Sequence, residues 1–164
     1  MHRDISSAAP PRRRIGAVVL LRDSNGYVLM VKPTYKSGWI LPGGGLHGGE
    51  SIQVGAAREL QEETGLSRTP THFVALDQVP AAEDGTSAEG FNVVCDGGRL
   101  TAKEAAAVSV PASAAHELSD FQWVPLADLS KYALPYQHRR IWAAVHAIEN
   151  GHRLPLLMHG NPVI

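Results

Sequence analysis

The spacing of apolar residues changes several times along this chain, and each change predicts a different element. Residues 15–21 form a nearly continuous apolar run, which is typical of a strand covered on both faces. The Asn-Gly pair in residues 23–26 predicts a tight hairpin turn, because glycine adopts the positive φ that such turns need. Residues 27–31 then return as a second strand. Residues 39–41 form a short third segment, which ends at Pro42.

A helix is expected after the glycine-rich stretch at residues 43–49. Ser51 is a suitable N-cap, because its hydroxyl can accept a hydrogen bond from a free backbone N–H. The helix should end near Thr64, since Gly65 suits the left-handed conformation that closes helices. Gly55 inside this helix costs up to about 1 kcal/mol relative to alanine. Contacts outside the helix must therefore hold it in place.

The second half of the chain predicts further strands and one longer helix. The strand candidates are residues 73–76, 91–95 and 121–124. Thr101 and Glu104 have the spacing of a capping box. The last helix should cover residues 136–150, with one apolar face and with Trp142 buried. This alternation of periods predicts an α/β fold in which helices cover a mixed sheet.

Composition limits the classes of protein that fit. The length of 164 residues suits one domain, which we place at residues 15–164 behind a mobile arm at residues 1–14. The single Cys95 cannot form an internal disulfide, so a reducing, cytoplasmic location is expected. No apolar stretch approaches the roughly 18 residues of a membrane span. Four of the 15 basic residues lie in the arm; the remainder has 11 basic and 15 acidic residues, which disfavours a general nucleic-acid surface.

The helix after the glycines carries an unusual group of acidic residues. Glu59, Glu62 and Glu63 stand at i, i+3 and i+4, so their side chains share one face, with β-carbons roughly 5–6 Å apart. Three like charges this close repel one another, and the C-terminal end of the helix dipole disfavours them further. Carboxylates without neighbouring Cys or His suit hard cations such as Mg²⁺ or Mn²⁺. Such ions bridge to phosphates, so the pattern predicts metal-assisted hydrolysis at phosphorus.

These residues belong to a longer pattern that resembles the Nudix hydrolase family, in its MutT-like form. The pattern runs from Gly44 to Leu66. It reads Gly44, five residues, Glu50, seven residues, Arg58-Glu59-Leu60, one residue, Glu62-Glu63, one residue and Gly65-Leu66. The stretches at residues 39–43 and 117–126 are also similar to that family, and residues 94–100 resemble a bacterial, actinobacterial branch. The resemblance implies an α/β/α sandwich with a mixed sheet and a loop–helix–loop motif.

The resemblance also implies roles for particular residues. The metal ligands would be Glu59, Glu62, Glu63 and the carbonyl oxygen of Gly43. Glu59 is also a candidate base for the attacking water, and Glu117 is a candidate ligand or base with a plain surface carboxylate as the alternative. The remaining implied roles are orientation of the carboxylates by Arg58, pairing of Glu50 with Arg58, helix termination at Gly65, and phosphate contacts at Gly44 and Lys32. A plain surface lysine is the alternative for Lys32.

The substrate remains open at this level. The family hydrolyses a nucleoside diphosphate linked to another group, so a small nucleotide is the expected partner, without membrane or nucleic acid. Our first expectation is an oxidised or normal nucleoside triphosphate, converted to monophosphate and pyrophosphate. ADP-ribose or another nucleotide sugar is the alternative. A second alternative is a non-catalytic module that senses a nucleotide. Dimers are common in the family, which leaves a homodimer open.

Overall fold

The computed structural model describes residues 12–164, and residues 1–11 of the expected arm lie outside the described part. Its strands are β1 (Arg14–Arg22), β2 (Val28–Pro33), β3 (Gly43–Gly45), β4 (His72–Val79), β5 (Gly90–Arg99), β6 (Leu118–Val124), β7 (Leu154–Pro155), β8 (Leu157–Met158) and β9 (Asn161–Pro162). Its helices are α1 (Ile52–Thr64), α2 (Ala102–Ala106), α3 (Leu129–Tyr132) and α4 (Pro135–Glu149), with 3₁₀ turns η1 (Ala112–Ala114) and η2 (Leu126–Asp128). The predicted mixed α/β fold is confirmed.

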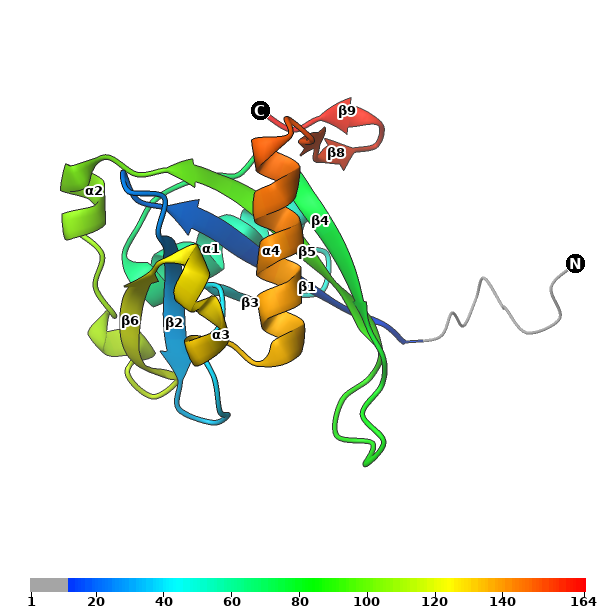
Figure 1. The fold of residues 1–164 in the computed structure, drawn as a ribbon. Coiled ribbons are helices and arrows are strands. Elements are labelled where there is room, and N and C mark those ends of the chain that lie inside the picture. Colours follow the sequence, from blue (N-terminus) through cyan, green and yellow to red (C-terminus); the bar gives the residue numbers. More distant parts are fainter. Residues whose placement is uncertain (1–11) are drawn as a thin grey trace, which may run out of the picture.

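One mixed sheet organises the described residues. Its strand order is β6-β2-β1-β5-β4-β7, and β3 pairs with β1 beside this series. β1 runs parallel to β5 but antiparallel to β2 and β3. Figure 1 shows α4 in front of the sheet and α1 behind it, so the sheet lies between two helical layers. None of the helices in the described part is long and apolar enough to span a bilayer.

The continuous apolar run of β1 follows from this position between the helices. Side chains alternate along a strand. Ala17, Val19 and Leu21 join the core cluster that contains Ala56 and Leu60 of α1. Leu20 instead joins the cluster that contains Ile141, Ala144 and Val145 of α4. Both faces of β1 are therefore buried, and apolar residues are needed at odd and even positions alike.

Two details differ from the expectations. The stretch at residues 39–41 contributes only an isolated bridge between Ile40 and Val31, and the third strand is the glycine run Gly43–Gly45. Glycine has low strand propensity, so propensity points away from this strand. Trp142 is 42% exposed because it lies off the buried face of α4, where it contacts His138 at 6.3 Å between ring centroids.

Candidate active site

Helix α1 has the ends that its sequence predicts, and outside contacts explain its internal glycine. The Ser51 hydroxyl accepts a hydrogen bond from the backbone N–H of the third helical residue at 3.2 Å. Gly65 closes the helix with a φ of 73°. A Cβ at Gly55 would come within 2.1 Å of a methyl of Leu46 and 3.0 Å of a Glu50 oxygen. Glycine at this position therefore lets the preceding loop pack directly on the helix.

Arg58 joins the loop to the acidic face of α1. Its Nε and Nη2 donate to the two carboxylate oxygens of Glu50 at 2.8 and 2.9 Å. Its Nη1 donates to Glu59 at 2.8 Å and to Glu62 at 3.1 Å. Nη2 also reaches the carbonyl oxygen of Gly45 at 3.3 Å. The predicted pairing of Glu50 with Arg58 is present, and one guanidinium contacts three carboxylates.

These contacts change the acidity of Glu50. The hydrogen bonds from Arg58, together with one from the His47 backbone N–H at 2.9 Å, lower the pKa of Glu50 to about 2. The same carboxylate raises the pKa of Arg58 above its ordinary value. Hydrogen bonds to a charged form favour that form. Both groups therefore carry their charges at neutral pH.

Glu59 and Glu63 lie against the glycine strand β3. The backbone N–H of Gly43 donates to Glu63 Oε2 at 2.7 Å. A Cβ at Gly44 would come within 2.6 Å of Glu59 Oε1, so only glycine leaves room for that carboxylate. Burial raises the pKa of Glu63 to about 8 against the lowering effect of the Gly43 N–H, and burial also raises the pKa of Glu59. Negative charge on this face is therefore poorly compensated by the protein itself.

The acidic face opens into a cleft of about 390 Å³. The residues that line it are Glu59, Glu62, Glu63, Ser113, Ala114, His116 and Glu117. Glu117 comes from the segment just before β6, more than fifty residues beyond α1. The structure thus brings Glu117 to the same cleft as the three helix carboxylates, and its role as ligand or base stays a prediction. Among the described residues, no group of three or more His, Cys, Asp or Glu side chains already has metal-binding geometry.

Lys32 occupies a different place. It lies exposed on β2, with Nζ 5.8 Å from the centroid of the Trp39 ring. It lines neither the acidic cleft nor the cavity beside β3. Its expected phosphate contact stays a prediction. Lys36, four residues further on, does line a cavity beside β3.

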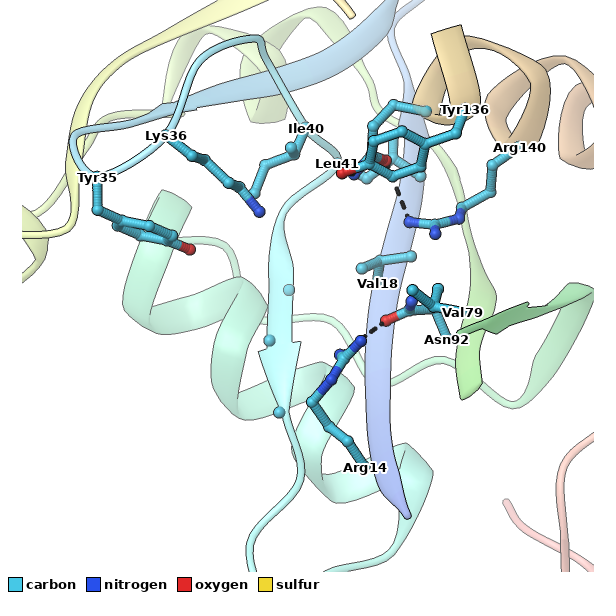
Figure 2. Close-up of a pocket in the computed structure, with 14 residues that line it drawn as sticks. Arg14, Val18, Tyr35, Lys36, Ile40, Leu41, Val79, Asn92, Tyr136 and Arg140 are labelled. Carbon is cyan, nitrogen blue, oxygen red and sulfur yellow. Dashed lines mark hydrogen bonds between the residues drawn. The ribbon is translucent and has the colours of Figure 1, made fainter. Parts of the chain in front are cut away.

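This second cavity, of about 230 Å³, contains residues that the sequence analysis missed. Figure 2 shows Arg14, Asn92 and Arg140 gathered beside β3 from strands β1 and β5 and helix α4. The sequence does contain a signal for two of these residues, Asn92 and Arg140. Asn92 is the single polar residue in the apolar run of residues 91–95, and Arg140 lies on the apolar face of α4 beside Ile141. A polar residue on a face that must be buried requires a partner or a ligand.

The fold and the cleft together define the class of protein. It is an α/β/α sandwich in which a glycine strand and an acidic helix form an oxygen-lined cleft, the type of site that handles phosphates through divalent cations. A family model for the NUDIX domain matches residues 11–145, most of the chain. The chain therefore belongs to the NUDIX family.

Individual relatives agree with this assignment. The chain is 42% identical over 57 residues to the phosphatase NudJ of Escherichia coli strain K12, an alignment that covers 34% of this chain and 37% of the relative. The MutT protein of Methanosarcina mazei superposes with a TM-score of 0.67 at 27% identity, covering 84% of this chain and 95% of that one. The NUDIX domain of Shewanella oneidensis NrtR, solved with ADP-ribose, gives 0.66 at 19% identity, covering 88% and 94%. The last of these supports the fold alone.

Proposed function

We propose that this protein hydrolyses a phosphoanhydride bond in a nucleoside diphosphate linked to another group, with Mg²⁺ or Mn²⁺ as its cofactor. The observation that carries the proposal is the cleft in which Glu59, Glu62, Glu63 and Glu117 meet beside β3. Membership of the NUDIX family supports the same reaction. An acidic cleft repels a polyphosphate unless a cation lies between them, so the charge of the cleft and the proposed substrate require each other.

The donor set fits a hard divalent cation. All four side chains offer carboxylate oxygens, and no sulfur or imidazole nitrogen is needed. Glu63 is 7% exposed, and within residues 12–164 its single hydrogen bond uses only Oε2, which leaves Oε1 free. Glu59, Glu62, Glu63 and the Gly43 carbonyl would hold the ion. When bound, the ion would polarise phosphoryl oxygens and lower the pKa of water.

The residues around the carboxylates have separate tasks in this proposal. Arg58 orients Glu59 and Glu62, and Glu50 fixes Arg58 from the loop side. The Gly43 N–H holds the Glu63 carboxylate against β3. Glu59 is the first candidate to accept a proton from the attacking water, and Glu117, from the segment just before β6, is the second.

For the substrate, we retain a normal or oxidised nucleoside triphosphate, cleaved to monophosphate and pyrophosphate, as the first candidate. ADP-ribose or another nucleotide sugar is the second. A nucleotide sensor without turnover is the remaining alternative. A sensor does not need all the carboxylates of the cleft, whereas this chain has each of them.

A substrate panel tests the proposal directly. Nucleoside triphosphates, oxidised nucleoside triphosphates, ADP-ribose and dinucleoside polyphosphates are incubated with Mg²⁺, and products are separated by chromatography. Glu62→Gln should lower kcat by orders of magnitude with a smaller effect on KM. Glu83→Gln, at an exposed carboxylate outside the cleft, is the matched control and should retain activity. Full turnover in Glu62→Gln contradicts the mechanism, and binding without turnover in the wild type favours the sensor.

A further inference from the structure

The cavity beside β3 has the opposite charge character to the acidic cleft. Three of its lining residues are cationic, Arg14, Lys36 and Arg140, and none of its lining residues is acidic. The acidic cleft is lined by four glutamates and by no lysine or arginine. Because Gly43 and Gly44 border the cavity and also contact Glu63 and Glu59, the two sites meet at β3. A substrate held at the cleft therefore has this cavity next to it.

The size of the cavity limits what it can hold. Its volume of about 230 Å³ is below the roughly 300–1,000 Å³ of a pocket for a complete drug-sized ligand. It therefore suits one end of a nucleotide. Arg14 and Lys36 are exposed residues of its rim, while its interior contains buried polar side chains.

Three polar side chains in the interior are more than nine-tenths buried. Asn92 is 8% exposed, Gln137 is 6% exposed and Arg140 is 7% exposed. Figure 2 shows the Arg140 guanidinium above Val18 and the Asn92 amide below it, and all three residues line the cavity. Buried polar groups are normally hydrogen-bonded, so the hydrogen bonds that these groups leave unused define what a ligand must offer.

The acceptor atoms of this group are already in use. Arginine only donates, so the Asn92 amide must turn its oxygen toward Arg14, where Nη1 lies 3.5 Å from Oδ1. The Gln137 amide likewise turns Oε1 to Arg140 Nη1 at 3.1 Å, and its Nε2 donates to the Tyr136 hydroxyl at 3.2 Å. Arg140 is held by Asp77, whose Oδ2 lies 2.6 Å from both Nε and Nη2. These contacts orient the Gln137 amide at both ends, and the Arg14 contact turns the Asn92 oxygen toward the rim, which leaves Nδ2 on the other side of the amide.

The groups left unused are donors. Among the described residues, Asn92 Nδ2 has no hydrogen-bond partner, and Arg140 has N–H groups beyond those given to Asp77 and Gln137. A carbonyl oxygen on the ligand would match these donors. An exocyclic amino group would place donor against donor, and such a mismatch leaves buried groups unpaired.

We propose that this pocket binds the nucleobase of the substrate and selects a base with a ring carbonyl, a 6-oxopurine or a 4-oxopyrimidine, through Asn92 Nδ2 and Arg140. The inference rests on the proposed function, because it places the diphosphate at the acidic cleft. Arg14 and Lys36 at the rim then lie on the path of the phosphates. Asn92 and Arg140 are specificity-determining residues in this assignment, and the carboxylates of the cleft do not choose the base.

Binding of matched nucleotides tests the pocket without requiring turnover. The α,β-methylene diphosphates of inosine and adenosine differ in the 6-oxo or 6-amino group and the associated N1 proton, and their methylene bridge resists hydrolysis. Isothermal titration calorimetry with Mg²⁺ should give a Kd for the inosine analogue roughly tenfold or more below that of the adenosine analogue. The uridine and cytidine analogues should differ in the same direction. Equal Kd values, within about threefold, would overturn the proposal.

Asn92→Asp supplies the test on the protein side. The substitution keeps the shape and replaces the Nδ2 donor by an acceptor oxygen, so the inosine preference should fall to threefold or less, or reverse. Asn161→Asp, at an exposed residue of β9, is the matched control and should retain the wild-type ratio. An unchanged ratio in Asn92→Asp contradicts the proposal. If that variant does not fold, the comparison of the two analogues on the wild type still decides.

The two proposals fail in distinguishable ways. Absence of turnover across the substrate panel, together with a clear preference for the inosine analogue, would refute the hydrolase and retain the pocket. Turnover of adenosine and inosine nucleotides with equal kcat/KM would retain the hydrolase and refute the pocket.

Discussion

The substitution Glu63→Gln is expected to stabilise the metal-free protein while it removes activity. Glu63 is 7% exposed, and burial raises its pKa to about 8 from an ordinary value of 4.5. Glutamine has nearly the shape of the protonated carboxyl group and keeps an oxygen that can accept the Gly43 N–H. The variant therefore keeps the local contact but removes the need to hold a proton at neutral pH.

The sign and size follow from linkage between protonation and folding. Below pH 4.5 the carboxyl is protonated in both the folded and the unfolded state. Between pH 4.5 and 8 the unfolded state loses this proton while the folded state keeps it, so the wild type loses stability as pH rises. A solution at pH 7 lies about 2.5 pH units above the unfolded-state pKa of 4.5. This difference corresponds to a loss of about 3 kcal/mol in the free energy of unfolding of the wild type. Glu63→Gln should recover this free energy at pH 7 and almost none of it at pH 4.

Thermal unfolding in EDTA measures the effect. For a chain of this length, about 3 kcal/mol corresponds to a Tm increase of roughly 6–12 °C at pH 7. Glu83→Gln, at an exposed carboxylate, should leave Tm unchanged at both pH values. Adding Mg²⁺ should raise the Tm of the wild type more than that of the variant, because an ion that binds only the folded state stabilises it. A variant that is no more stable than the wild type at pH 7, or equally stabilised at pH 4, would refute the reasoning.

Three further predictions concern the loop and β3. Gly44→Ala should cut activity at least tenfold with little change in Tm, because the new Cβ would displace the Glu59 carboxylate. Gly45→Ala is the control: a Cβ there has no neighbouring atom within 4 Å, so this variant should behave as wild type in both assays. Gly43→Ala should lose the fold or several kcal/mol of stability in denaturant titration, because its φ is 137° and its Cβ would lie 2.2 Å from a backbone carbonyl oxygen of β1. Glu50→Gln should flatten acid unfolding between pH 4.5 and 2, since the lowered pKa stabilises the wild type above that range and the contribution is lost as pH falls through it. A Gly43→Ala variant as stable as the wild type, or an unchanged acid transition in Glu50→Gln, would contradict these arguments.

Local signals were sufficient for most of the fold. The ends of α1 depend on Ser51 and Gly65, and both act within one turn of the helix. The doubly buried β1 was visible as a run without alternation. The glycine strand β3 was not, because its strand character comes from pairing with Gly16, Ala17 and Val18 of β1 and not from its own residues. Long-range pairing of this kind overrides local propensity.

The two halves of the site differ in the same way. The carboxylates of α1 were predictable because their spacing of three and four residues is a local property of one helix. The base pocket draws Arg14, Asn92 and Arg140 from three elements that the sheet brings together. No spacing in the sequence relates these residues. Only Asn92 and Arg140 are marked, as polar residues in apolar patterns, and that signal does not say which residues they meet.

The charge balance of the acidic cleft connects the architecture with the chemistry. One arginine, Arg58, contacts three carboxylates, two of which, Glu59 and Glu62, also line the cleft with Glu63 and Glu117. One positive charge cannot neutralise this number of carboxylates, and the pKa of Glu63 is raised by burial and then by the neighbouring carboxylates. A proton on Glu63 relieves part of it, and a divalent cation would relieve more, with two charges and several oxygen ligands. Gly43 and Gly44 of β3 bring the backbone close to the carboxylates of Glu63 and Glu59. The fold that crowds these negative charges together therefore also supplies the carboxylate and backbone oxygens that would surround a cation.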